Sequence, residues 1–202
     1  DVARRDADIQ VIDVDLSGSM QGTKFINAMA MAVAVAYAAE KTRTLNCTVA
    51  VRDADGGAAH IAILYDSRRH TFNQLRAVVP YISVAGGTPE GLCFEAVKDE
   101  ILSRAKANVT QYFINLSDGE PGCSFQYKNR HYSYGSQPAF DHTRRLMNEF
   151  RNAGIKVLSY FISEEAANQT NFRTMYGASA SFIKPDQING VIRTINRLLT
   201  GE

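Results

Sequence analysis

The feature that most constrains the fold of this chain is an alternation of short apolar runs with longer helical patterns. The run from Ile9 to Leu16 is rich in Ile and Val and is broken by Asp13 and Asp15, which predicts a strand buried on both faces. The Ala-rich stretch 23–42 that follows predicts a largely buried helix. Further strands are predicted over 46–52, 60–66, 110–116, 156–163 and 180–183, and further helices over 71–79, 89–102, 141–151, 171–176 and 187–199.

Strands that alternate with helices predict an α/β fold, a doubly wound sheet with helices on both faces. The short connection 53–57 indicates a hairpin, so one strand at the sheet edge should be antiparallel. We therefore expect a mostly parallel six-stranded sheet in the order 3-2-1-4-5-6. The absence of internal repeats and linkers in the sequence predicts a single domain over residues 1–202. Because the chain starts at Asp1 rather than at Met, we expect this domain to be part of a longer polypeptide.

Composition argues against several classes of partner. The chain has 22 Lys and Arg against 21 Asp and Glu, and its formal charge of +1 favours neither nucleic acid nor an anionic membrane. Its longest apolar run, 28–39, is shorter than the roughly 20 residues that cross a bilayer. The three cysteines, Cys47, Cys93 and Cys123, cannot all pair, and the N-terminal stretch DVARRDAD lacks the apolar region of a signal peptide. These features predict a cytoplasmic protein with reduced thiols.

Side chains that carry oxygen atoms gather in three of the predicted loops. Asp15, Ser17 and Ser19 follow the first strand, Thr88 precedes the third helix, and Asp118 follows the fourth strand. Ligands of open parallel sheets bind beyond the carboxyl ends of the strands, where the strand order reverses. In the expected order the first and fourth strands flank that point, so Asp15 and Asp118 should face each other. Carboxylate and hydroxyl oxygens are hard ligands, which predicts a site for Mg²⁺ or Mn²⁺.

Each of these residues also has a purely structural interpretation. Ser17 or Ser19 suits the cap of one helix, Thr88 suits the cap of the next, and Asp118 suits a turn. One residue can fill both roles. The agreement of three separated loops favours the metal site over a structural role alone.

The three loops resemble the metal-ion-dependent adhesion site of von Willebrand factor A domains. The matching segments are DLSGSM at 15–20, GGTPEG at 86–91 and LSDGEP at 116–121. The resemblance implies that the two serines and the threonine bind the metal directly, and that the two aspartates bind it directly or through water. It also implies that an acidic residue of a protein partner completes the coordination. The expected function is therefore that of a binding module and not of an enzyme.

A narrower resemblance concerns residues 116–163. LSDGEP, a long aromatic insert and DHTRRLMNEFRNAGIKVLSYFIS are similar to the A domains of intracellular cobaltochelatase CobT-like subunits of bacteria or phage. The same segments also resemble other A-domain proteins that work beside AAA+ ATPases of the MoxR type. The resemblance implies a non-catalytic subunit of an ATPase-linked assembly, with such an ATPase as its partner.

Residues 120–140 show no periodicity and are rich in aromatic side chains. A loop of this length without secondary structure is usually functional or disordered. Aromatic residues and Arg are typical of protein interfaces, so we expect a partner-recognition loop beside the metal, with a disordered lid as the alternative. Asp141 is then the expected N-cap of the next helix. The candidate contact residues are Phe125, Tyr127, Arg130, Tyr132 and Tyr134.

An enzymatic alternative comes from the segment VIDVDLS. It also resembles the first motif of haloacid-dehalogenase phosphatases, which implies Asp13 as nucleophile, Asp15 as acid/base and magnesium as cofactor. That family also needs a Lys on the phosphate and a later pair of acidic residues, whereas the fourth-strand loop offers only Asp118. We therefore expect Asp13 to have a structural role or to lie behind the metal ligands.

Overall fold

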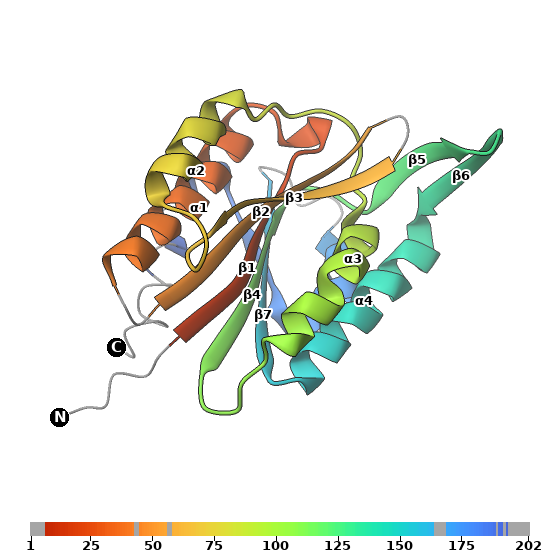
Figure 1. The fold of residues 1–202 in the computed structure, drawn as a ribbon. Coiled ribbons are helices and arrows are strands. Elements are labelled where there is room, and N and C mark those ends of the chain that lie inside the picture. Colours follow the sequence, from red (N-terminus) through yellow and green to blue (C-terminus); the bar gives the residue numbers. More distant parts are fainter. Residues whose placement is uncertain are drawn as a thin grey trace.

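A computed structural model of the chain describes residues 7–42, 45–55, 58–163, 169–188, 190, 191 and 193. Its main sheet has six strands: β1 (Ala7–Asp15), β2 (Leu45–Asp55), β3 (Ala58–Asp66), β4 (Thr110–Ser117), β7 (Ile155–Ile162) and β8 (Ala180–Ile183). They are arranged in the order β3-β2-β1-β4-β7-β8 (Figure 1). Neighbours are parallel except for β2 and β3, which form an antiparallel pair at the edge. The mostly parallel sheet with an antiparallel edge strand is thus confirmed.

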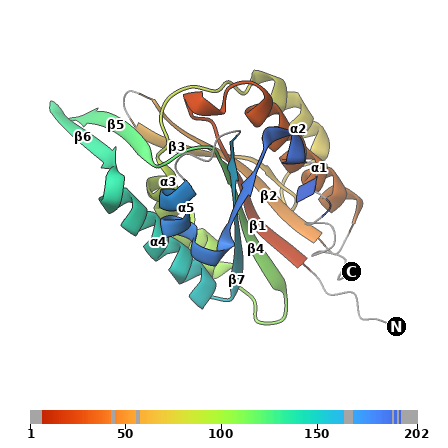
Figure 2. The ribbon, with the colours of Figure 1, turned by 180° about the vertical axis from the view of Figure 1, so that it is seen from behind.

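Helices cover both faces of the sheet, as the sequence predicts. They are α1 (Thr23–Lys41), α2 (Phe72–Val78), α3 (Glu90–Ser103), α4 (Ser136–Asn152) and α5 (Gln169–Tyr176), with short 3-10 helices at Gly18–Met20, Val79–Tyr81, Gly177–Ser179 and Pro185–Gln187. On one face, Val35 of α1 shares a core with Val14 of β1. The other face is covered by α3 and α4 (Figure 2). There the ring of Phe113 lies 5.0 Å from that of Phe94 and 5.1 Å from that of Phe150. Burial of these two apolar layers is the main stabilisation of the fold.

Residues 120–140 do not form an irregular loop, contrary to the prediction. They contain a two-stranded antiparallel hairpin, β5 (Gly122–Tyr127) and β6 (Arg130–Gly135), which leads directly into α4. Its turn is Lys128–Asn129, with φ values of 48° and 59°, as in the type I′ turns that match the twist of hairpins. The hairpin projects from the rest of the molecule in both views (Figure 1 and Figure 2).

The hairpin corrects two further predictions. α4 begins at Ser136, so Asp141 lies inside this helix and not at its N-cap. Because β5 and β6 precede the last two strands of the main sheet along the chain, the strand order is 3-2-1-4-7-8 and not 3-2-1-4-5-6. The helix predicted over 187–199 falls largely on residues outside the described ranges.

Two features of the structure concern the predictions of reduced thiols and of no membrane-spanning segment. Cys47 and Cys93 are buried and Cys123 is half-buried, and all three are free thiols. Within the described ranges, no helix combines the length and the apolar character that crossing a membrane requires.

Candidate metal centre

The pleat of β1 turns Asp13 and Asp15, near the end of the strand, toward the α3 face of the sheet. Val11 packs in the core on that face, whereas Ile12 and Val14 pack on the α1 face. Side chains of a strand alternate between its faces, so Asp13 and Asp15 share the α3 face with Val11. Both aspartates are fully buried, and Asp15 is the last residue of the strand. The strand thus ends in a buried carboxylate at the carboxyl edge of the sheet.

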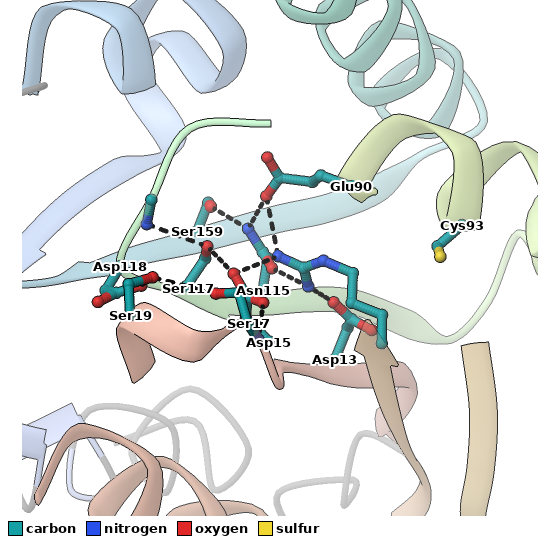
Figure 3. Close-up of polar contacts among 12 residues, drawn as sticks. Asp13, Asp15, Ser17, Ser19, Glu90, Cys93, Asn115, Ser117, Asp118 and Ser159 are labelled. Carbon is teal, nitrogen blue, oxygen red and sulfur yellow. Dashed lines mark hydrogen bonds and ion pairs between the residues drawn. The ribbon is translucent and has the colours of Figure 1, made fainter. Parts of the chain in front are cut away.

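Hydrogen bonds link the carboxylates and hydroxyls at this edge, one of them through a backbone N–H (Figure 3). Asp15 Oδ1 accepts a hydrogen bond of 2.8 Å from the backbone N–H of Ser17, and the hydroxyls of Ser17 and Ser19 lie 3.1 Å apart. The Ser19 hydroxyl donates to Asp118 Oδ1 over 2.7 Å. The Ser117 hydroxyl donates to Asp15 Oδ2 over 2.6 Å. The loops after β1 and β4 are therefore joined through their oxygen atoms.

Thr88 comes to the same edge from a third loop. Its backbone exchanges two hydrogen bonds with Gly122 of β5, each 2.9 Å long. A Cβ atom placed on Gly119 would lie 3.8 Å from both Ser19 Oγ and Thr88 Oγ1, so these two hydroxyls border the same small space. The structure therefore brings all five predicted ligands to one edge of the sheet.

A positive charge lies against this group of oxygens. The ammonium of Lys24, on the first turn of α1, contacts Asp118 Oδ2 and donates to the backbone carbonyl of Ser19 over 3.1 Å. The Asp118 side chain is only 1% exposed. A buried carboxylate is costly unless a cation or hydrogen-bond donors accompany it. The contact with Lys24 marks a position at which the structure accommodates a cation.

The donor set fits a small, hard divalent cation. Two carboxylates and three hydroxyls offer oxygen ligands only, which suits Mg²⁺ or Mn²⁺ and disfavours Zn²⁺ or Cu²⁺. In the part of the chain that the structure describes, no three His, Cys, Asp or Glu side chains are grouped as a metal site would require. A cation at this edge would therefore depend on the hydroxyl ligands as well as on the two aspartates.

A buried polar layer that was not predicted from the sequence lies directly beneath these oxygens. In the strand ladder Arg52 lies opposite Asp15, and Asn115 lies opposite Asp13 on one side and Ser159 on the other. The buried Arg52 guanidinium forms an ion pair with Asp13, lies 3.5 Å from Asp15 Oδ2 and donates to Asn115 Oδ1 over 2.9 Å. The signal in the sequence is a polar residue within each of these four apolar strands.

Glu90 closes this layer from the first turn of α3. Its Oε1 accepts hydrogen bonds from Arg52 over 3.2 Å, from Asn115 over 2.8 Å and from the hydroxyl of Tyr176. Burial raises the pKa of Glu90, although Arg52 beside it acts in the opposite direction. Burial also raises the pKa of Asp15 to about 7, against the hydrogen bonds that it accepts. Three carboxyl groups, those of Asp13, Asp15 and Glu90, thus surround the one guanidinium of Arg52, and a further cation nearby would favour their charged forms.

Four of the five candidate contact residues lie in the outer part of the hairpin. The rings of Phe125 and Tyr132 stack across the two strands with centroids 5.8 Å apart, and Tyr132 is 42% exposed. Tyr127 and Arg130 pair in the ladder beside the turn, and Arg130 is exposed. The hairpin thus presents an aromatic pair and a basic residue to the surroundings.

Tyr134, the fifth of these residues, anchors the hairpin instead. Its hydroxyl lies 3.1 Å from Nδ1 of His142 in α4, and the two rings meet edge to face. Burial raises the pKa of Tyr134 to about 12. A Cβ atom on Gly91 of α3 would lie 2.2 Å from this hydroxyl, so the tyrosine fits closely between the two helices.

The comparisons with known proteins come from solved structures. No protein-family model and no curated protein matches this sequence. The chain is similar to the pilus adhesin SpaC from Lactobacillus rhamnosus GG in its open conformation, with a TM-score of 0.68 and 12% identity over 97% of this chain and 30% of that one. It is similar to a von Willebrand factor type A protein from Catenulispora acidiphila (TM-score 0.66, 16% identity, 98% of this chain and 43% of that one). It is also similar to the manganese-loaded TRAP protein of Plasmodium vivax (TM-score 0.66, 14% identity, 98% of this chain and 75% of that one).

The chain therefore has the fold of von Willebrand factor A domains. At identities of 12% to 16% this likeness defines the fold alone. The chain spans 30% of the SpaC chain and 43% of the Catenulispora chain, so it matches one part of those larger proteins.

Proposed function

We propose that this chain is a metal-dependent protein-interaction module. Ser17, Ser19 and Thr88 would hold Mg²⁺ or Mn²⁺ directly, Asp15 and Asp118 directly or through water, and the ion would bind an acidic side chain of a partner. The observation that carries the proposal is the chain of contacts from Asp15 through both serines to Asp118, with the Thr88 hydroxyl bordering the same space.

The donor set explains why the partner should be acidic. Three of the five ligands are neutral hydroxyls, so a bound divalent cation keeps part of its charge. A carboxylate from a partner supplies a negative charge and a further oxygen ligand. Two proteins that share the fold agree with this function, because SpaC is an adhesin and TRAP was solved loaded with manganese.

The position of Asp13, the nucleophile of the phosphatase alternative, does not support that alternative. The carboxylate of Asp13 is fully buried and is paired with Arg52, which is itself fully buried. A nucleophile has to reach the substrate, and Asp13 cannot do so from this position. Asp13 instead helps to compensate the charge of Arg52 beneath the candidate metal site.

We further propose that the hairpin is the second contact surface for the partner. Residues 121–135 contain no acidic side chain, whereas Lys128 and Arg130 at the turn are basic. The exposed ring of Tyr132, stacked on Phe125, offers the aromatic surface that is typical of interface cores. Both properties complement a partner that brings an acidic segment to the metal edge.

The narrower proposal concerns the identity of the partner. We propose an AAA+ ATPase of the MoxR or chelatase type in the cytoplasm, with this chain as a CobT-like, non-catalytic subunit. Its support is the resemblance of residues 116–163 described above. SpaC, which shares the fold, is a pilus adhesin, so identification of the partner decides between a cytoplasmic and an extracellular setting.

The test of the proposed function is retention of a partner from native lysate by the immobilised chain, in Mg²⁺ and in EDTA. We expect retention in Mg²⁺ only, and its loss in Asp15→Asn and Asp118→Asn variants whose circular dichroism is unchanged. Equal retention in EDTA would contradict a metal-dependent function. An AAA+ ATPase identified by mass spectrometry would support the narrower proposal, and a protein of another class would contradict it.

The hairpin is tested by shortening it within its own ladder. Ser124 and Ser133 face each other as a pair, so Asn-Gly can replace residues 125–132 and close the turn between them. This variant keeps Tyr134 and the pairing of Gly122. We expect it to lose the partner and to keep Mn²⁺ binding. Unchanged partner retention would show that the outer hairpin is not a contact surface.

A further inference from the structure

Lys24 reaches back from the first turn of α1 to the oxygens of the candidate metal site. Its ammonium contacts Asp118 Oδ2 and donates to the carbonyl oxygen of Ser19 over 3.1 Å. Asp118 Oδ1 accepts the hydrogen bond of 2.7 Å from the Ser19 hydroxyl. Both oxygens of this carboxylate therefore have a partner, and one of these partners carries a full positive charge.

The two basic residues at the site differ in how firmly they are held. Arg52, which lies beside Asp15, is fully buried and donates a hydrogen bond to Asn115. The Lys24 side chain is 27% exposed. A lysine is a point charge on a flexible stem, whereas the arginine fork is fixed by several hydrogen bonds at once. Lys24 can therefore leave Asp118 for solvent while Arg52 stays in place.

We infer that Lys24 competes with the divalent cation for Asp118 and sets the metal concentration at which the site fills. The inference rests on the proposed metal site. A cation bound to Asp118 Oδ2 would lie a few Å from the present position of the ammonium, and like charges this close repel strongly where water is largely excluded. The metal and Lys24 therefore contact this oxygen in turn. The lysine also keeps the buried carboxylate compensated when metal is scarce.

Binding of Mn²⁺ to the full chain, followed by the electron paramagnetic resonance signal of the free ion, tests this competition. Lys24→Met keeps most of the length of the side chain and removes its charge. Lys41→Met makes the same change at the other end of α1 and serves as the matched control. We expect Lys24→Met to bind Mn²⁺ about tenfold more tightly than the unchanged protein, as removal of one nearby like charge predicts. We expect Lys41→Met to bind it as the unchanged protein does.

Thermal unfolding gives a second readout, measured without following the free Mn²⁺. In EDTA, Lys24→Met should melt at a lower temperature than the unchanged protein, because Asp118 is then buried without its cation. Saturating Mn²⁺ should raise the melting temperature of Lys24→Met by more than that of the unchanged protein, since a tighter ligand stabilises more. If Lys24→Met does not fold, Lys24→Gln is compared in the same two measurements.

The outcomes separate the inference from the function on which it rests. Mn²⁺ binding that is equal or weaker in the Lys24 variant overturns the competition and leaves the metal site in place. Absence of Mn²⁺ binding in both the unchanged protein and the variant overturns the proposed function itself. Tighter binding in the variant, together with the larger rise in melting temperature, supports the competition.

Discussion

Thr88 and Gly122 exchange two backbone hydrogen bonds, each 2.9 Å long, and so join the loop of a candidate metal ligand to the first residue of the hairpin. The neighbouring Gly87 leaves no room for a side chain. A Cβ atom there would lie 2.6 Å from the carbonyl oxygen of Gly122 and 2.9 Å from Cβ of Cys123. The metal edge and the hairpin are therefore built as one unit.

Gly87→Ala should disturb the contact between the Thr88 loop and the hairpin. The added methyl group would push the Thr88 loop away from β5, which should cost about 1–3 kcal/mol of the free energy of unfolding and weaken Mn²⁺ binding. Gly122→Ala is the matched control, because its Cβ atom would lie 3.7 Å from the nearest neighbour, the carbonyl oxygen of Glu120. Urea unfolding and Mn²⁺ titration check both variants. Equal Mn²⁺ affinity in the two would contradict a coupling between loop and hairpin.

Gly91→Ala should displace Tyr134, the residue that anchors the hairpin to α3 and α4. Its Cβ atom would lie 2.2 Å from the hydroxyl of Tyr134 and 3.1 Å from Nδ1 of His142, so the tyrosine has to move out. A two-stranded hairpin without such an anchor is marginally stable. We expect faster amide hydrogen exchange over 123–134 and little change in β1 and β4. Unaltered exchange in the hairpin would show that Tyr134 does not hold it.

Arg52→Met should destabilise the fold strongly. The substitution removes the cation that pairs with the buried Asp13 and donates to the buried Glu90, which leaves uncompensated charge in the interior. Removal of one partner of a buried ion pair typically costs about 3–5 kcal/mol. Urea unfolding measures this loss, and a second change, Asp13→Asn, should recover part of it. A decrease of less than about 1 kcal/mol in the free energy of unfolding would contradict charge compensation of Asp13 and Glu90 by Arg52.

Asp66 should make stability depend on pH in the acid range. Burial alone would raise its pKa, but the hydrogen bonds from Arg68 and the charges of Arg68 and Arg104 together lower the pKa below the ordinary value of 3.8. A carboxyl with a lowered pKa in the folded state stabilises the fold above its unfolded pKa, and this stabilisation is lost as the pH falls through the folded pKa. Asp66→Asn should therefore reduce the free energy of unfolding at about pH 6 and have a smaller effect at about pH 3. The same difference at both pH values would contradict the role of Asp66.

The convergence of the site could be predicted because it follows from strand order. Asp15 ends the first strand and Asp118 directly follows the fourth. The alternation of strands and helices predicts that these two strands are parallel neighbours, and the carboxyl ends of parallel neighbours lie at one edge of the sheet. Thr88 could be predicted only from its motif, since its position depends on backbone pairing with Gly122. That pairing involves a hairpin that the sequence analysis did not find.

The hairpin and the polar layer could not be predicted, for different reasons. The turn Lys128–Asn129 has φ above zero at both residues without a glycine, so it lacks the usual signal of a type I′ turn. The alignment of Arg52, Asn115 and Ser159 depends on strand register. The ladders of β1 contain an irregularity between Ile9 and Ile12 that hydrophobic periodicity does not show.

The divalent-cation site at the carboxyl edge of the sheet is tested most directly by calorimetric titration of the chain with Mn²⁺. Asp118→Asn removes one candidate ligand, and Asp8→Asn is its control. Asp8 is also buried and lies 3.7 Å from a basic residue, Arg68, but at the opposite end of β1. We expect one Mn²⁺ to bind per chain, with an affinity that is unchanged in Asp8→Asn and at least about tenfold weaker in Asp118→Asn. No binding at millimolar Mn²⁺, or equal affinity in the two variants, would contradict this expectation.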